Sequence, residues 1–268
     1  MIASANLGLG GNLAALTMIK QPRRMVYYSS EAIFLYKTLT DRRGLMQRNL
    51  YEVFDCQAVQ EISLAGMDRD RSTTRQPIDG LPYWRQGASY ITDLVNLCLL
   101  CQIKKPQTVF EIGTLDGFSA LHFALNTPPE TVVYTLDLPR DGSISPSLHT
   151  TIVDDSMMHS YLSGRGYCFA NEEVAKKIVC LQGDSASFDF SPYLGSVDLF
   201  FIDGAHSYEY VRSDTLNAVR CSRRGGVVVW HDFGRMGVNG VSRWISELSR
   251  SRRILSTPGG SLAFMEVE

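Results

Sequence analysis

The 268-residue sequence predicts an α/β fold in which helices wrap a mostly parallel sheet. Three observations support this prediction. From about residue 86 onward, short apolar runs rich in β-branched residues alternate with segments long enough to form helices. The first of these runs is followed by a turn that contains glycines. The last two runs are separated by Pro258-Gly259-Gly260, which is typical of a hairpin, so we expect an antiparallel strand at the C-terminus.

The expected elements of this domain follow one another in regular order. We expect helices at residues 88–102, 119–125 and 239–249. We expect strands at residues 108–112, 131–138, 177–182, 197–202, 226–230, 253–256 and 261–267. Residues 1–85 lack this alternation and hold helical patches, so we interpret them as a helical N-terminal segment. That segment would serve as a cap or in oligomerisation, and residues 86–268 form the main domain.

The connection between the second and third strands is unusually long. Residues 139–176 are far more than a plain helical crossover needs. Insertions at the carboxyl edge of a parallel sheet often cover a binding site, so we favour a lid here. The alternative is a structural excursion that contacts no ligand.

Composition and charge exclude some classes of function. The formal net charge is −2 and the pI is about 6.2, so no general electrostatic attraction draws the chain toward nucleic acid or an anionic membrane, and only a local basic patch stays open. No apolar run is long enough to cross a bilayer, and the order of charges near residue 20 does not suit a secretory signal. Cys98 and Cys101 form a CxxC pair without a second pair to complete a zinc site. We interpret them as buried thiols of a cytoplasmic protein.

The turn after the first strand predicts a cofactor site. Residues 108–117 read TVFEIGTLDG, where Gly113 and Gly117 allow a tight turn before a helix whose free N–H groups can receive a polar ligand. The spacing is GxxxG and not the GxGxxG of dinucleotide enzymes. Asp137 ends the next strand about 20 residues later, where an acid suits the two hydroxyls of a ribose. Turn and acid together indicate a nucleoside-type cofactor.

Several stretches resemble one known family. These are EIGTLDG at 111–117, QGDS at 182–185, FIDGAHSYEYVRSD at 201–214 and GGVVVWHDF at 225–233. Together they resemble the class I S-adenosylmethionine-dependent methyltransferases, and most closely the branch called methyltransferase family 24, which is related to metal-dependent O-methyltransferases. The likeness covers about residues 86–268. It implies a Rossmann-like, doubly wound sheet of seven strands with the last one antiparallel.

The resemblance also implies residues that contact S-adenosylmethionine. Glu111 and Gly113 would line its methionine part, and Asp137 would hold its ribose. The remaining expected contacts are Gly117, Phe118 and Ser119 at the helix start, Asp184 and Ser185 near the adenine, and Asp203.

Two further strand ends predict the chemistry. Asp203 and Asp232 follow neighbouring strands, and their hard oxygen ligands suit a Mg²⁺ ion with His231 as a neighbouring ligand. His206 would be the base that takes a proton from a hydroxyl acceptor. Alternatively, Asp203 caps the next helix, and His231 with Asp232 forms a structural pair. We interpret Asp214, on that helix, as a solvated residue.

These observations favour a methyltransferase that methylates a hydroxyl of a small molecule, such as a sugar or secondary metabolite. Nucleic acid and membranes are not expected partners, and a homo-oligomer stays open. Two other classes of protein remain as alternatives. One is a non-catalytic, cofactor-binding partner or scaffold subunit, and the other is a nicotinamide oxidoreductase, which the GxxxG spacing disfavours.

Overall fold

A computed structural model describes residues 60–61, 91–162, 166–235, 237–257 and 260–268. The N-terminal helical segment expected at 1–85 lies outside the described residues, apart from residues 60–61. So does most of the hairpin turn expected at 258–260. The rest of the predicted domain is described.

The described residues form one mixed sheet, in the order β1-β7-β8-β6-β5-β2-β3-β4. Its strands are β1 Gln60–Glu61, β2 Thr108–Ile112, β3 Val132–Asp137, β4 Ile178–Gln182, β5 Val197–Ile202, β6 Ser222–Trp230, β7 Leu255–Ser256 and β8 Ala263–Glu266. Strands β2 to β6 run parallel, and β8 pairs antiparallel with both β6 and β7. The predicted seven-stranded, Rossmann-like sheet with an antiparallel C-terminal strand is confirmed. The short β1, from the segment expected to be helical, adds an eighth strand parallel to β7.

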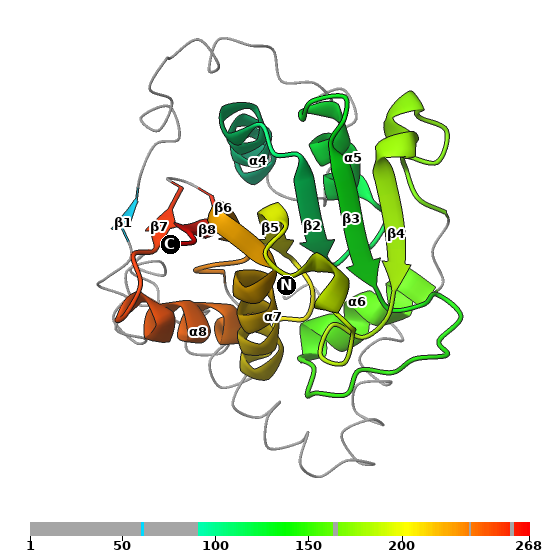
Figure 1. The fold of residues 1–268 in the computed structure, drawn as a ribbon. Helices are drawn as coiled ribbons and strands as arrows, with labels where there is room; N and C mark the ends of the chain where they lie inside the picture. Colours follow the sequence, from blue (N-terminus) through cyan, green and yellow to red (C-terminus); the bar gives the residue numbers. More distant parts are fainter. Residues whose placement is uncertain (1–59, 62–90, 163–165, 236, 258–259) are drawn as a thin grey trace, which may run out of the picture.

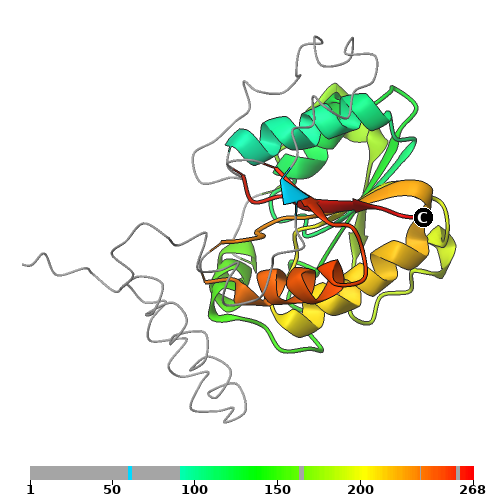
Figure 2. The ribbon, with the colours of Figure 1, turned by 90° about the vertical axis from the view of Figure 1, so that its left-hand side faces the viewer.

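Helices cover both faces of the sheet. They are α4 Ile91–Lys104, α5 Phe118–Leu125, α6 Ile152–Leu162, α7 Tyr208–Cys221 and α8 Asn239–Ser249, with short 3₁₀ turns η4 Glu173–Lys177 and η5 Ser191–Tyr193. Helices α4 and α5 lie on one face and α7 and α8 on the other, as the two views in Figures 1 and 2 show. The result is a three-layer α/β/α arrangement.

Alternating side chains of the strands fill two separate cores. On β2, Val109 packs toward α4 and α5, whereas its neighbour Phe110 packs toward α7 and α8. On β5, Phe200 and Phe201 divide in the same way, since successive residues of a strand point to opposite faces. All of β5 is therefore buried, which explains why it is apolar except at Asp198.

The carboxyl ends of the parallel strands meet at one edge of the sheet, where we expect the functional site. Helix α6, from the 139–176 insertion, lies just beyond the carboxyl ends of β2 and β3 (Figure 1). Ligands bind at this edge of open α/β sheets. None of the helices described is long and apolar enough to span a membrane.

Candidate active site

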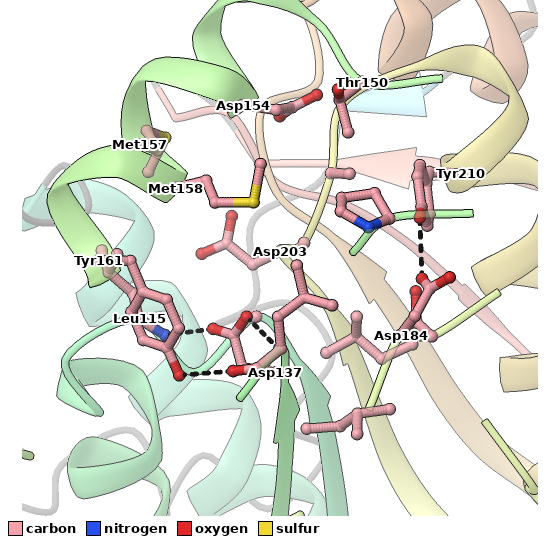
Figure 3. A pocket seen from close by; sticks show the side chains of 18 of the residues that line it. Leu115, Asp137, Thr150, Asp154, Met157, Met158, Tyr161, Asp184, Asp203 and Tyr210 are labelled. Atoms are coloured by element: carbon pink, nitrogen blue, oxygen red, sulfur yellow. Dashed lines mark hydrogen bonds between the residues drawn. The ribbon is translucent and has the colours of Figure 1, made fainter. Parts of the chain in front are cut away.

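A pocket of about 780 Å³ opens at the carboxyl edge of the sheet. The volume includes space that is open to solvent. Figure 3 shows side chains from β3, α6 and the ends of β4 and β5 facing it. Its lining includes Gly113, Leu115, Asp137, Pro146, Thr150, Asp154, Met157, Met158, Tyr161, Asp184, Ser185, Asp203, His206 and Tyr210. The insertion thus supplies a whole wall of the pocket.

The glycine turn is tightly packed against its neighbours. Gly113 has a φ of 100° and Gly117 a φ of 81°, a region that favours glycine. A Cβ on Gly113 would collide with the carbonyl of Asp203, and one on Gly117 would collide with the ring of Phe169. Both glycines are therefore required, one by the end of β5 and the other by the insertion.

Glu111 lies beneath the turn and is fully buried. Its carboxyl group accepts hydrogen bonds from the hydroxyls of Ser119 and Thr135, the latter at 2.5 Å. Thr135 is in turn 2.7 Å from the hydroxyl of Thr114. Burial raises the pKa of Glu111 to about 8, against the effect of these two donors. This network braces the turn from below, and neither threonine was singled out by the sequence.

Asp137 stands at the wall of the pocket, at the end of β3. Its carboxylate oxygens accept hydrogen bonds from the backbone N–H groups of Leu115 and Leu138, both at 2.8 Å (Figure 3). Burial raises its pKa, while these N–H groups oppose that rise. The acid is thus fixed in place beside the turn, and a carboxylate oxygen can also accept from a hydroxyl of a ligand.

Asp184 joins the sheet edge to the insertion. Its Oδ2 accepts from the backbone N–H of Ser147 at 2.9 Å and from the hydroxyl of the same residue at 2.5 Å. Its Oδ1 accepts from the Tyr210 hydroxyl at 2.8 Å. Both oxygens are engaged within the protein, so Asp184 orders the pocket wall, and the neighbouring Ser185 also lines the cavity.

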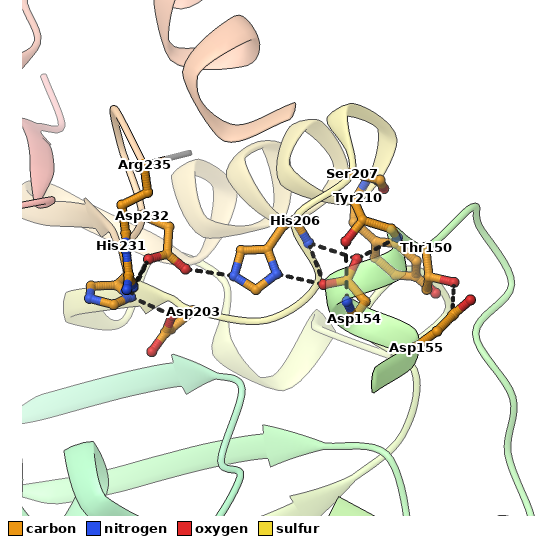
Figure 4. Close-up of polar contacts among 11 residues, drawn as sticks. Thr150, Asp154, Asp155, Asp203, His206, Ser207, Tyr210, His231, Asp232 and Arg235 are labelled. Carbon is orange, nitrogen blue, oxygen red and sulfur yellow. Dashed lines mark hydrogen bonds and ion pairs between the residues drawn. The ribbon is translucent and has the colours of Figure 1, made fainter. Parts of the chain in front are cut away.

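His206 lies between two carboxylates. Its Nδ1 is 2.5 Å from Oδ1 of Asp154, and its Nε2 is 2.6 Å from Oδ2 of Asp232 (Figure 4). Burial opposes the charged ring, but the two carboxylates outweigh burial and raise the pKa of His206 well above its usual value. Because carboxylates accept, the ring donates from both nitrogens in this arrangement. A general base needs one ring nitrogen without a proton.

The carboxylate of Asp232 lies beside several positively charged side chains at the carboxyl edge of the sheet. Besides His206, the guanidinium of Arg235 donates to its carboxylate, and Nδ1 of His231 lies 3.3 Å from it. The same Nδ1 donates to Oδ1 of Asp203 at 2.9 Å. Burial favours the neutral acid, but His231 and His206 hold the pKa of Asp232 well below its usual value. The edge is a chain of alternating carboxylates and cations.

Three of these residues could hold a metal ion. One ligand atom from each of Asp203, His206 and Asp232 lies within 4.8 Å of the others. Two carboxylates and an imidazole are donors that divalent ions accept, so the residues fit such an ion. His231 stands beside this group through its contacts with both carboxylates, and its Nε2 is 3.4 Å from Asp93 on α4.

The structure brings together part of the predicted site. The residues that share the pocket are Gly113, Asp137, Asp184, Ser185, Asp203 and His206. The residues that stand outside its lining are Glu111, Gly117, Phe118 and Ser119, with His231 and Asp232 behind Asp203 and His206. Asp154, which sequence analysis missed, joins the site from the insertion. The pattern Thr151-x-x-Asp154 was the available signal, since it is typical of a helix start.

Two alternatives from the sequence are wrong. Asp203 does not cap α7, because the hydroxyl of Ser207 does so by accepting from the backbone N–H of Tyr210. Asp214 is not a solvated residue, because it is fully buried within α7. Neither of its carboxylate oxygens has a hydrogen-bond partner among the described residues, and burial raises its pKa to about 7.

The sequence around this site matches one family model. Residues 110–233 match the family model described as a methyltransferase domain. That stretch of the chain is similar to a methyltransferase domain. The matched stretch runs from β2 to just beyond β6, and so includes the glycine turn, Asp137, Asp203, His206 and Asp232. The resemblance to class I methyltransferases seen in the sequence is thereby confirmed, while no curated protein matches the chain.

Solved structures with a similar fold are distant. Cofactor-bound Rv0187 from MTB is 22% identical, with 68% of this chain and 83% of that chain covered, at a TM-score of 0.47. The O-methyltransferase TomG from Streptomyces achromogenes, in complex with SAM, is 18% identical, with 82% and 96% covered, at 0.47. An O-methyltransferase from Bacillus cereus in complex with SAH is 15% identical, with 88% and 97% covered, at 0.46.

Proposed function

We propose that this methyltransferase uses S-adenosylmethionine to methylate a hydroxyl group of a small molecule. The observation that carries the proposal is that Asp137 and the Asp203–His206 edge line one cavity. A strand-end acid beside a glycine turn suits a ribose, and an imidazole suits proton removal from a hydroxyl. A cofactor site and a proton-accepting group thus meet in one pocket.

The chain's own residues would divide the work. The Gly113 turn and Asp137 hold the nucleoside part of the cofactor, which when bound supplies an electrophilic methyl group on a sulfonium. His206 takes the acceptor's proton at Nε2, which must then be without its own proton, while Nδ1 keeps its proton toward Asp154. The apolar side chains of Leu115, Met157 and Met158 line the cavity beside these polar groups.

We further propose that Asp203 and Asp232 hold a magnesium ion, with His231 fixing the orientation of both carboxylates. A divalent ion would supply a lower pKa for a nearby hydroxyl. His206 cannot bind the ion and accept a proton through the same Nε2, so we assign it the proton. We place the protein in the cytoplasm, in keeping with the five free cysteines of the described residues.

Cofactor binding and turnover test the proposal separately. Calorimetry should show S-adenosylmethionine binding and no binding of NAD(H), and the reverse result would make the protein a nicotinamide enzyme. Transfer of a labelled methyl group to a panel of hydroxylated sugars and aromatic alcohols should then identify the acceptor class. Treatment with EDTA should abolish turnover and added Mg²⁺ restore it. Unchanged turnover in EDTA would remove the metal from the proposal.

One observation favours a second candidate, a cofactor-binding protein without catalysis. Both ring nitrogens of His206 are engaged with carboxylates, which leaves no acceptor for a proton in this arrangement. Such a protein would bind S-adenosylmethionine and transfer no methyl group, whether or not His206 is replaced by Gln. A large loss of transfer in His206→Gln, with cofactor affinity kept, favours the enzyme.

A further inference from the structure

The start of α6 and the ring of His206 share one carboxylate. At the helix start, Asp154 accepts from the backbone N–H of Thr151 at 2.7 Å, and its own N–H donates to the Thr151 hydroxyl at 3.1 Å. This reciprocal pair is a capping box, which satisfies two N–H groups that a helix start leaves free. Helix α6 can therefore begin at Ile152 because Asp154 turns back over its first residues.

The same side chain holds His206 in two ways. Its Oδ1 accepts from Nδ1 of the ring at 2.5 Å and from the backbone N–H of His206 at 3.1 Å. Asp154 is 8% exposed and His206 6% exposed, so water hardly competes for these contacts. A charge-assisted bond between buried groups is among the stronger hydrogen bonds in a protein. The ring is thus held at Nδ1 by the insertion and at Nε2 by Asp232.

We propose that Asp154 is the positioning residue of His206, supplied by the insertion. By accepting a hydrogen bond from Nδ1, it fixes the orientation in which Nε2 faces Asp232, at the edge where the acceptor would lose its proton. This inference rests on the proposed function for its catalytic meaning. It deepens that function, because a residue of α6 then orients the side chain that accepts the proton.

Other contacts hold the insertion independently of Asp154. Ser147 donates to Asp184, and the Tyr161 hydroxyl donates to the carbonyl of Leu138 at 3.0 Å. The guanidinium of Arg140 lies 4.7 Å from the ring centre of Tyr161 and 4.6 Å from that of Tyr167. These contacts, at both ends of the segment, should keep α6 over the pocket when Asp154 changes. A variant at Asp154 therefore tests how the His206 ring is held and not how the insertion is attached to the domain.

The experiment compares Asp154→Asn with Thr151→Ala as a matched control. The first variant keeps the shape of the side chain and removes its charge from His206. The second removes the hydroxyl of the capping box and leaves the carboxylate in place. Protein labelled with ¹⁵N-histidine gives the ring signals at one fixed pH, and His206→Gln identifies those of His206. Hydrogen exchange along α6 measures the helix itself.

We expect Asp154→Asn to lose the strongly deshielded Nδ1 proton of His206, whereas Thr151→Ala keeps it while α6 exchanges faster. Transfer to the acceptor should fall about 10²–10⁴-fold in kcat for Asp154→Asn, the usual range for general acid–base catalysis. The affinity for S-adenosylmethionine should stay unchanged. If Asp154→Asn fails to fold, Asp154→Glu displaces the carboxylate, keeps its charge, and should shift the same ring signals.

Two outcomes would overturn the inference. One is a His206 ring spectrum in Asp154→Asn identical to that of the unaltered protein. The other is an equal loss of the Nδ1 proton in Thr151→Ala, which would mean that Asp154 acts only through the helix. Failure of the proposed function looks different, because the unaltered protein would then transfer no methyl group to any acceptor even though its His206 spectrum is as expected.

Discussion

Replacing Asp214 with Asn should stabilise the protein, and the gain should grow as the pH rises. Asp214 is fully buried, and its carboxylate oxygens have no hydrogen-bond partner among the described residues. Burial raises the pKa of Asp214 from 3.8 to about 7, which the nearby Ser185 opposes only in part. The unfolded chain therefore releases this proton at a lower pH than the folded protein. Between these two pKa values, stability falls as the pH rises.

The size of the effect follows from the two pKa values. A difference of about three pKa units corresponds to about 4 kcal/mol of lost stability at pH 8, where both states are ionised. At pH 5 only the unfolded chain is ionised, and the loss is about 2 kcal/mol. Asn cannot ionise, so Asp214→Asn should gain roughly 2–3 kcal/mol more at pH 8 than at pH 5.

Urea denaturation at both pH values measures this difference. Glu111, whose pKa burial raises to about 8, titrates in a similar window in both proteins and cancels in the comparison. Asp189→Asn is a suitable control, because Asp189 is exposed and its carboxylate accepts from the backbone N–H of Ser191, which an amide oxygen can also do. A gain for Asp214→Asn that is the same at both pH values, or a loss at pH 8, would refute the reasoning.

Three further predictions concern Gly113 in the glycine turn, Ser207 at the start of α7, and Asp137 at the end of β3. Gly113→Ala should lower the melting temperature and abolish cofactor binding in calorimetry. A Cβ at this position would collide with the Asp203 carbonyl, and the φ of 100° is unfavourable for alanine. A variant with unaltered cofactor affinity would contradict this prediction. Ser207→Ala removes the hydroxyl that accepts from the backbone N–H of Tyr210 and should lower the free energy of unfolding by about 1 kcal/mol in urea denaturation. An unchanged free energy of unfolding would show that this cap does not stabilise α7. Asp137→Ala should weaken S-adenosylmethionine about 10–100-fold by calorimetry while the fold is kept, because hydrogen bonds to a charged group contribute about 1.5–3 kcal/mol; equal affinity would remove Asp137 from the cofactor site.

The strands of the central sheet could be predicted almost residue by residue. Thr108–Ile112 and Val197–Ile202 are the predicted strands unchanged, because helices cover both faces of the sheet and most residues of these strands are apolar. The two-residue strand β1 could not be predicted, since Gln60 and Glu61 carry no pattern and pair with β7 only through tertiary contact. Short strands depend on their partner more than on their own residues.

The site could be predicted only where its residues end a strand. Asp137 and Asp203 follow apolar runs, so the topology alone brings them to one edge. Asp154 lies 52 residues before His206, on an insertion with no periodic signal, and its pairing depends on how that insertion folds back. Asp214 was assigned to the wrong face, although Val211, Thr215 and Ala218 already show the spacing of a buried helix stripe around it.

The order of strands in the sheet also bears on synthesis. Strand β8 lies between β6 and β7, yet it is made after both of them. Until it emerges from the ribosome, β6 has a free edge that carries Val227 to Trp230, all buried in the finished protein. An uncovered apolar edge of this kind invites pairing between nascent chains. Chains cut before Ala263 should therefore aggregate, and the last few residues should limit the yield of soluble protein.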